Sequence, residues 1–333
     1  MAEINFRMSY SGYRRAFDIS KPVDFCIYCG EDDPELLTDE HVAPEGLSGD
    51  LILLSASCKT CAALTGYSEL RVLRGPLAIV REHHQLYGRR HEDERPEELP
   101  LEIRRKDWTL EKVMLPVSEF PFVFRMPRFP APRLLRAAQG HDADYHRKFD
   151  YRQFDTADGI NKAKQILSID DQRERLELDM NVYELSKVLA KIAYGFAVVM
   201  LGPYSIRPYV VDLIVAPRGH APSFLYYVGG AFHGNDHIEQ LTTKDIGKVV
   251  VRIEVVNGLS VVVVSLQLLG YLNAPVYDIV VGELVSLDEP RPLVSTIKRH
   301  SLSYGALRLL SGQIVDNPDL ASPGFITDGQ TDS

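Results

Sequence analysis

The sequence predicts an α+β fold in which a small cysteine-bearing domain precedes an antiparallel sheet packed on a long helix. The first observation is that all four cysteines lie between positions 26 and 61. The second is a helical repeat of apolar residues over 181–200. The third is a series of Val-rich, strand-like runs that follow this helix, two of which flank an Asn-Gly pair.

The chain of 333 residues is long enough for about two domains. Changes of composition along it predict five segments. These are an N-terminal arm (1–22), a cysteine-bearing domain (23–90), a linker and irregular connecting region (91–175), an α+β domain (176–312) and a loose tail (313–333). Within the second segment, 67–88 predicts a helix that Gly75-Pro76 interrupts. The third segment opens with the charged, Pro-containing run HEDERPEELP, which is typical of a surface loop.

The C-terminal domain is predicted from its periodicity. Apolar residues recur at helical spacing over 181–200, and Gly202-Pro203 ends the predicted helix. The predicted strands are 210–215, 224–228, 249–255, 259–268 and 279–281. Asn257-Gly258 lies between two of them and predicts a hairpin with a type I′ turn.

Composition limits the classes of function. The chain carries 37 Lys and Arg against 46 Asp and Glu, a net charge of −9, so any nucleic-acid contact must use a local basic patch. No run of 18 apolar residues exists, which predicts no membrane-spanning helix. The first residues lack the apolar core of a secretory signal, so we expect a cytoplasmic protein with no membrane partner.

The cysteines form two CxxC pairs, Cys26 with Cys29 and Cys58 with Cys61. Two residues between cysteines let both thiolates of a tight turn point at one ion, and two such turns supply the four sulfurs of a structural zinc site. A redox CxxC usually occurs singly. The pairs therefore predict one Zn²⁺ per chain, and the 28 residues between them must form a hairpin or loop.

The run CIYCG…TDEHVAPEGLSG…LILLSASCKTC resembles the zinc-containing HNH endonucleases over about residues 23–66, and more loosely to 90. The resemblance implies a treble-clef, ββα-metal fold in which two CxxC pairs hold zinc. It implies a metal-dependent endonuclease that hydrolyses phosphodiester bonds of nucleic acid, with DNA expected. His41 would be the general base and Glu40 a ligand of a catalytic Mg²⁺ or Mn²⁺. Asp39, which shares a strand face with His41, is the weaker alternative ligand.

The sequence departs from the family's pattern at two positions. Ala62 follows the last cysteine, where the family usually has Asn or His, and a middle Asn has no clear counterpart, Asp50 being the nearest polar candidate. Thr65 and Glu69 lie on the helical face of Ala62, and Glu69 is chemically the better ligand. Two hypotheses follow. Either another side chain completes a catalytic metal site, or the module is inactive and binds nucleic acid or protein.

A basic stretch directly follows the cysteine region. Arg71, Arg74 and Arg81 lie in a segment with few acids, and the first two share one helical face. These guanidinium groups could bind phosphates beside the zinc site. The alternative is a solvated helix face that pairs with the acidic run 92–98.

Overall fold

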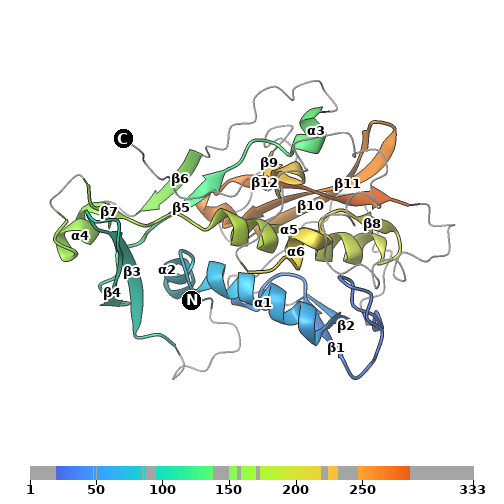
Figure 1. The fold of residues 1–333 in the computed structure, drawn as a ribbon, viewed down its shortest axis with the longest axis horizontal. Helices are drawn as coiled ribbons and strands as arrows, with labels where there is room; N and C mark the ends of the chain where they lie inside the picture. Colours follow the sequence, from blue (N-terminus) through green and yellow to red (C-terminus); the bar gives the residue numbers. More distant parts are fainter. Residues whose placement is uncertain are drawn as a thin grey trace, which may run out of the picture.

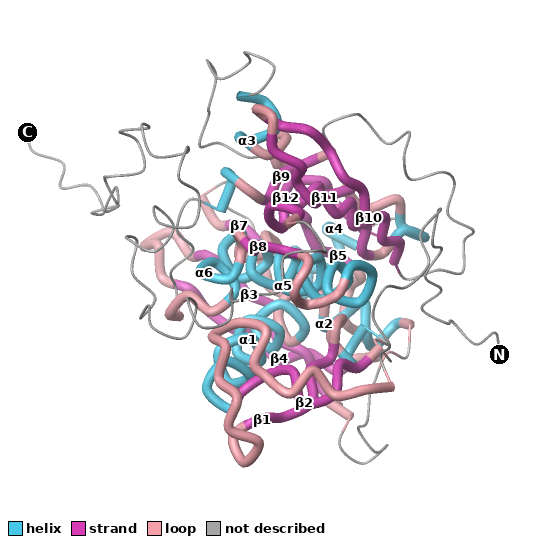
Figure 2. The backbone as a smooth tube through the Cα atoms, turned by 90° about the vertical axis from the view of Figure 1, so that its right-hand side faces the viewer, coloured by secondary structure: helices cyan, strands magenta, loops and turns pink. Residues whose placement is uncertain are grey.

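The computed structural model describes residues 20–47, 49, 51–84, 86, 95–137, 150–155, 159–169, 173–218, 224–231 and 247–285. Most of the predicted arm (1–22) and all of the predicted tail (313–333) lie outside these residues. The described part has three layers: a C-terminal sheet, a long helix, and an N-terminal layer of a hairpin and a helix (Figures 1 and 2). The predicted α+β class is confirmed.

The C-terminal sheet is antiparallel. Its strands run in the order β10-β11-β12-β8, and β9 also pairs with β12. Their bounds are β8 (Ile206–Pro208), β9 (Val228–Gly230), β10 (Gly247–Val256), β11 (Leu259–Leu268) and β12 (Val276–Leu284). Asn257 and Gly258 join β10 to β11 with φ angles of 51° and 82°, the left-handed values that a type I′ turn requires. The predicted hairpin is confirmed.

Helix α5 (Val182–Leu201) is the middle layer. Asn181 caps its N-terminus by accepting from the backbone N–H groups of Tyr183 and Glu184, and Gly202, with φ of 90°, ends it. Every residue from 184 to 200 is buried, because the sheet covers one side of the helix and α1 the other (Figure 1). The prediction of a long helix packed on an antiparallel sheet is confirmed. No helix among the described residues, α5 included, is long and apolar enough to cross a membrane.

The N-terminal layer is a hairpin followed by helices. Its elements are β1 (Leu37–His41), a 3-10 turn (Glu45–Leu47), β2 (Ile52–Cys58), α1 (Lys59–Leu73) and α2 (Ala78–His83). The antiparallel register shifts at Ser55, whose φ is 49° and whose N–H donates to Asp39 Oδ1 at 3.0 Å. The chain turns between the two helices at Gly75-Pro76, as predicted.

The region from 91 to 175 is more regular than its charged start suggested. It contains β3 (Glu98–Arg104), β4 (Leu110–Pro116), β5 (Val123–Arg128), α3 (Arg133–Ala137), β6 (Asp150–Asp155) and α4 (Gly159–Ile166), and β7 (Arg175–Leu176) follows. The sheet order is β4-β3-β7, with β5 and β6 paired separately. Leu99, Leu101 and Ile103 alternate with less buried residues along β3, which is the period of a half-buried strand.

The prediction of a strand is wrong for one apolar run and partly wrong for another. Residues 210–215 contain the short helix α6 (Val211–Ile214), and 224–228 begins with a 3-10 turn (Phe224–Tyr226) before β9. A short apolar run buried on all sides has the same composition in either state, so periodicity does not distinguish them.

One cluster of buried apolar residues joins the N-terminal layer to the C-terminal sheet. It includes Leu53 of β2, Val72 of α1, Ile192 of α5 and Val264 of β11. A smaller cluster, with Leu101, Ile103 and Leu167 among its members, lies beneath the β3–β4 hairpin. The cysteine-bearing layer therefore shares a core with the sheet.

Candidate metal centre

The first cysteine pair lies in a closed turn. Gly30 has a φ of 78° and its N–H donates to the Cys26 carbonyl at 2.8 Å, so the chain reverses directly after Cys29. A side chain at position 30 would be strained at this φ. The N–H of Ile27 donates to the Ala56 carbonyl at 2.9 Å, which ties the turn to β2.

The second pair lies at the junction of β2 and α1. Cys58 is the last residue of β2 and the N-cap of α1, and its Sγ accepts from the Cys61 N–H at 3.5 Å. The N-terminal end of a helix carries partial positive charge, which stabilises thiolates there. The fold thus brings one pair on a turn and one pair on a helix start to the same place.

The four sulfurs have the spacing of a metal site. All lie within 4.8 Å of one another, and the Sγ atoms of Cys29 and Cys58 are 3.6 Å apart. A tetrahedral ion with metal–sulfur bonds of about 2.3 Å separates its sulfurs by about 3.8 Å. A disulfide would need about 2.05 Å, and all four cysteines are free. Four cysteines that could hold a metal ion are therefore clustered as predicted.

The thiols ionise unequally. Hydrogen bonds from Cys26 and Cys61 lower the pKa of the Cys29 thiol to about 4. Hydrogen bonds with Cys26 and Cys29, together with burial, raise the pKa of Cys61. The Cys29 thiolate forms readily, and its negative charge disfavours ionisation of the Cys61 thiol beside it. A bound dication would stabilise all four thiolates, because a metal deprotonates the thiols that coordinate it.

Glu40 and His41 end β1 next to helix α5. The Glu40 side chain is buried, and its Oε1 lies 2.7 Å from the Nζ of Lys191. Glu69, on α1, places its Oε1 2.5 Å from the same nitrogen. The Lys191 ammonium also donates to the backbone carbonyl of His41. The structure thus brings Glu40 and Glu69 together, and Lys191, which was not among the predicted site residues, lies between them.

The charges in this cluster shift one another's pKa. Burial lowers the pKa of Lys191, but attraction to Glu69 and Glu40 outweighs burial and leaves the pKa raised. Burial raises the pKa of the Glu69 carboxyl, and Lys191 offsets only part of that rise. The ammonium therefore stays charged, with three acceptors for its three N–H donors.

Among the described residues, Glu40 and Glu69 do not belong to a second metal cluster. Within the described ranges, only the four cysteines bring three or more ligating side chains close enough to share an ion. The His41 side chain is half-buried, and its Nδ1 has no hydrogen-bond partner among the described residues. Asp50 lies outside the described residues. The roles of His41 as general base and of Glu40, Glu69 and Asp50 as ligands stay predictions.

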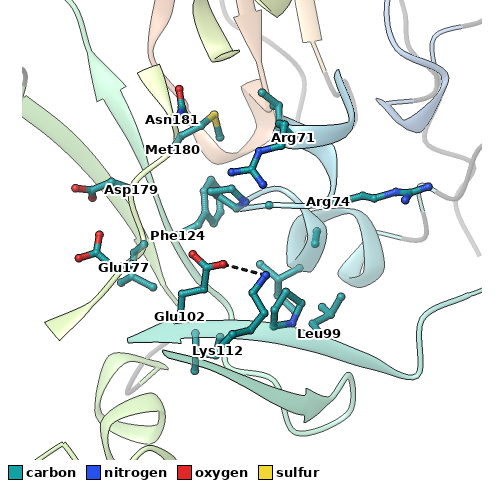
Figure 3. A pocket seen from close by; sticks show the side chains of 18 of the residues that line it. Arg71, Arg74, Leu99, Glu102, Lys112, Phe124, Glu177, Asp179, Met180 and Asn181 are labelled. Atoms are coloured by element: carbon teal, nitrogen blue, oxygen red, sulfur yellow. Dashed lines mark ion pairs between the residues drawn. The ribbon is translucent and has the colours of Figure 1, made fainter. Parts of the chain in front are cut away.

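The three arginines of the predicted basic patch lie in different environments. Arg81 is buried, and it donates through Nε to the Gly46 carbonyl at 2.8 Å and through Nη1 to the Leu73 carbonyl at 3.4 Å. Its guanidinium therefore holds the 3-10 turn against α1 and is not displayed to a phosphate. Arg71 and Arg74 are exposed and line a groove beside α1 (Figure 3).

One feature of the sequence indicates that Lys191 needs a buried partner. It lies in the middle of an otherwise apolar helical repeat, four residues after Lys187 and seven after Glu184. Charges on the buried face of a helix need partners. Here Glu184 accepts from the Ser68 hydroxyl at 2.7 Å and Lys187 donates to the carbonyls of Ala216 and Pro217 at 3.2 and 3.0 Å.

Comparisons of the chain with protein-family models, with curated proteins and with solved structures found no match.

Proposed function

We propose that residues 23–84 form a zinc-holding module of the treble-clef, HNH type that binds nucleic acid without cutting it. Zinc is the metal that the donor set favours, because four soft thiolates in a tetrahedral arrangement suit Zn²⁺ better than hard dications such as Mg²⁺. The zinc would hold the turn at Cys26 against the start of α1. It would supply no catalysis, since a site with four protein ligands has no open position.

The position of Lys191 carries the proposal that the module does not cut. Metal-dependent hydrolysis of a phosphodiester needs a dication held by carboxylates at the scissile phosphate. Glu40 and Glu69 instead contact one buried ammonium, which lies between them and offsets part of the negative charge that would attract a dication. Lys191 is itself almost inaccessible, so a phosphodiester could reach Glu40 only after α1 and α5 had separated.

The nucleic-acid contact would use Arg71 and Arg74. Both are exposed, and neither makes an ion pair with another described residue. A guanidinium can bind two phosphate oxygens at once. Since the chain has a net charge of −9, this contact is local and should depend strongly on salt. The same α1 helix carries Cys61 of the metal site, so metal binding positions these arginines.

The test combines binding and cleavage in one sample. Zinc-loaded protein is titrated into a labelled oligonucleotide at several salt concentrations, and plasmid is incubated with it in Mg²⁺ or Mn²⁺. We expect binding and no cut product. The Arg71→Gln, Arg74→Gln double variant should bind more weakly, and the slope of log affinity against log salt should fall by about one per lost phosphate contact.

The matched control is Lys162→Gln with Lys164→Gln, which removes two exposed charges from α4, away from α1. It should leave the salt slope unchanged. If both double variants weaken binding equally, binding depends on the net charge of the protein, and the assignment of the contact to Arg71 and Arg74 is wrong.

A second candidate is a metal-dependent nuclease with His41 as general base. It is favoured by one observation: Glu40, Glu69 and the His41 carbonyl meet at one point, which a dication could occupy if Lys191 withdrew. Plasmid cleavage that disappears in His41→Ala, with zinc content and fold unchanged, would establish this candidate in place of the first.

A further inference from the structure

A groove with a volume of about 750 Å³ lies beside the C-terminal half of α1. One wall is α1 and the turn to α2. The opposite wall is formed by β3, β4 and residues 177–183 (Figure 3). Its size is that of a ligand site. The candidate metal centre and Lys191 are not part of its lining.

The carboxylates of the groove have cationic partners. Glu102 pairs with Lys112 at 3.1 Å, the ion pair marked in Figure 3, and Glu177 pairs with Arg104 at 2.6 Å. Asp179 lies 3.6 Å from Arg125. Each lining carboxylate thus has a cationic partner, and for Asp179 that partner, Arg125, lies outside the lining.

Arg71 and Arg74 are the lining cations that pair with none of these carboxylates. In Figure 3 the Arg71 side chain extends into the space between the walls, whereas Arg74 points away from the labelled residues of the opposite wall. Neither guanidinium group has an ion pair or hydrogen bond with another residue that the structure describes. Two guanidinium groups one helical turn apart could follow the phosphates of one strand past the mouth of the groove.

The interior of the groove suits flat apolar groups. Leu99, Leu101 and Phe124 are buried in its floor, and Leu110 is 52% exposed at its side. Tyr151 and Tyr183 line it as well, and so does Tyr67, although the Arg218 guanidinium lies over the Tyr67 ring, 4.5 Å from its centroid. Proteins that bind single strands combine cations along the backbone with aromatic faces for the bases. Paired bases are stacked inside a duplex and cannot enter such a space unless they are flipped out.

We infer that this groove takes unpaired bases of a single-stranded nucleic acid, whose phosphates lie on Arg71 and Arg74. The inference rests on the proposed function, since it specifies which form of nucleic acid the module binds. A single strand should bind more tightly than the duplex of the same sequence.

The test is fluorescence anisotropy with a labelled 12-nucleotide single strand and with its duplex. In the wild-type protein, single-strand affinity should exceed duplex affinity by at least about fivefold, the equivalent of one stacked base. Leu110→Glu places a carboxylate inside the groove and should weaken single-strand binding at least about fivefold. Met114→Glu is the matched control, because Met114 is 47% exposed on the same strand but does not line the groove.

The outcomes separate the two proposals. Equal affinity for strand and duplex, or equal weakening by Leu110→Glu and Met114→Glu, would overturn the groove inference and leave the binding module standing. No binding of either nucleic acid by the zinc-loaded wild type would overturn the proposed function together with the inference. Since both substituted side chains are exposed, urea unfolding should show both variants folded.

Discussion

The side-chain nitrogen of Lys191 connects helix α5 to the N-terminal layer of the protein. Its ammonium contacts Glu40 at the end of β1 and Glu69 on α1, although its own backbone belongs to α5. A buried ion pair is not in itself a source of net stability, because both charges lose their water. Removal of one partner is nevertheless costly, since the remaining charges stay buried without compensation.

We predict that Lys191→Met, which keeps the length of the side chain and removes its charge, lowers the free energy of unfolding by about 3–5 kcal/mol. Adding Glu40→Gln and Glu69→Gln should recover part of this loss. The deficit should shrink as pH falls, because burial raises the pKa of Glu69 and its protonated form tolerates burial. Urea unfolding at pH 5 and pH 8 measures both effects. A deficit that is independent of pH, with no recovery in the triple variant, would show that the carboxylates are not what Lys191 stabilises.

At the scale of elements, α5 is the surface on which the cysteine-bearing layer packs. Glu184, Lys191 and Tyr194 all bond across to that layer, the last by donating from its hydroxyl to the Ile27 carbonyl at 3.0 Å. Between helix and hairpin the backbones approach closely at Gly195. A Cβ at Gly195 would lie 2.9 Å from Val42 Cγ1 and 3.3 Å from Val42 Cα.

We predict opposite results for two glycines in the interiors of helices. Gly195→Ala should destabilise the protein by about 1–3 kcal/mol, because the added methyl group forces α5 and the β1 loop apart. Gly66→Ala, on α1, meets no atom within 4 Å and should instead stabilise by up to about 1 kcal/mol through helix propensity. Thermal unfolding of the two variants checks this. Stabilisation by both substitutions would mean that α5 and the hairpin are not in close contact.

Some elements were predictable from local chemistry and others were not. The Asn257-Gly258 hairpin and the break at Gly75-Pro76 follow from backbone preferences of the residues themselves. The clustering of the cysteines follows from the CxxC spacing. Residues 211–214 are helical with Val211, Leu213 and Ile214 buried, and so short and mostly apolar a run does not reveal whether it forms a helix or a strand. Likewise, the contact of Lys191 with Glu40 joins residues 151 positions apart, and no local pattern predicts such a pairing.

At the scale of the whole molecule, metal binding and the stability of the sheet should be coupled. The cysteine-bearing layer and the C-terminal sheet belong to one apolar cluster, so loosening of one exposes the other. A shared core favours a single cooperative unfolding transition over two independent unfolding transitions.

We predict about one zinc ion per chain and its loss in Cys29→Ser or Cys58→Ser. Removal of the ion by a chelator should lower the midpoint of a single thermal transition, as followed by circular dichroism of the whole chain. Metal analysis and the melting curves are made on the same samples, with Ser57→Ala as a control that alters β2 next to the cysteines without removing a sulfur. A native protein without zinc, or a sheet transition that chelation leaves unchanged, would contradict this coupling.

Binding of Mn²⁺ to zinc-loaded protein, followed by electron paramagnetic resonance, tests most directly whether the ammonium closes the carboxylate site. The wild type should bind no tightly held Mn²⁺, because the Lys191 ammonium already lies between Glu40 and Glu69, where the ion would bind, and offsets part of their charge. Lys191→Ala should gain one site, and that site should disappear when Glu40→Gln is added. One Mn²⁺ bound tightly by the wild type and lost in Glu40→Gln would contradict the account and restore the catalytic metal.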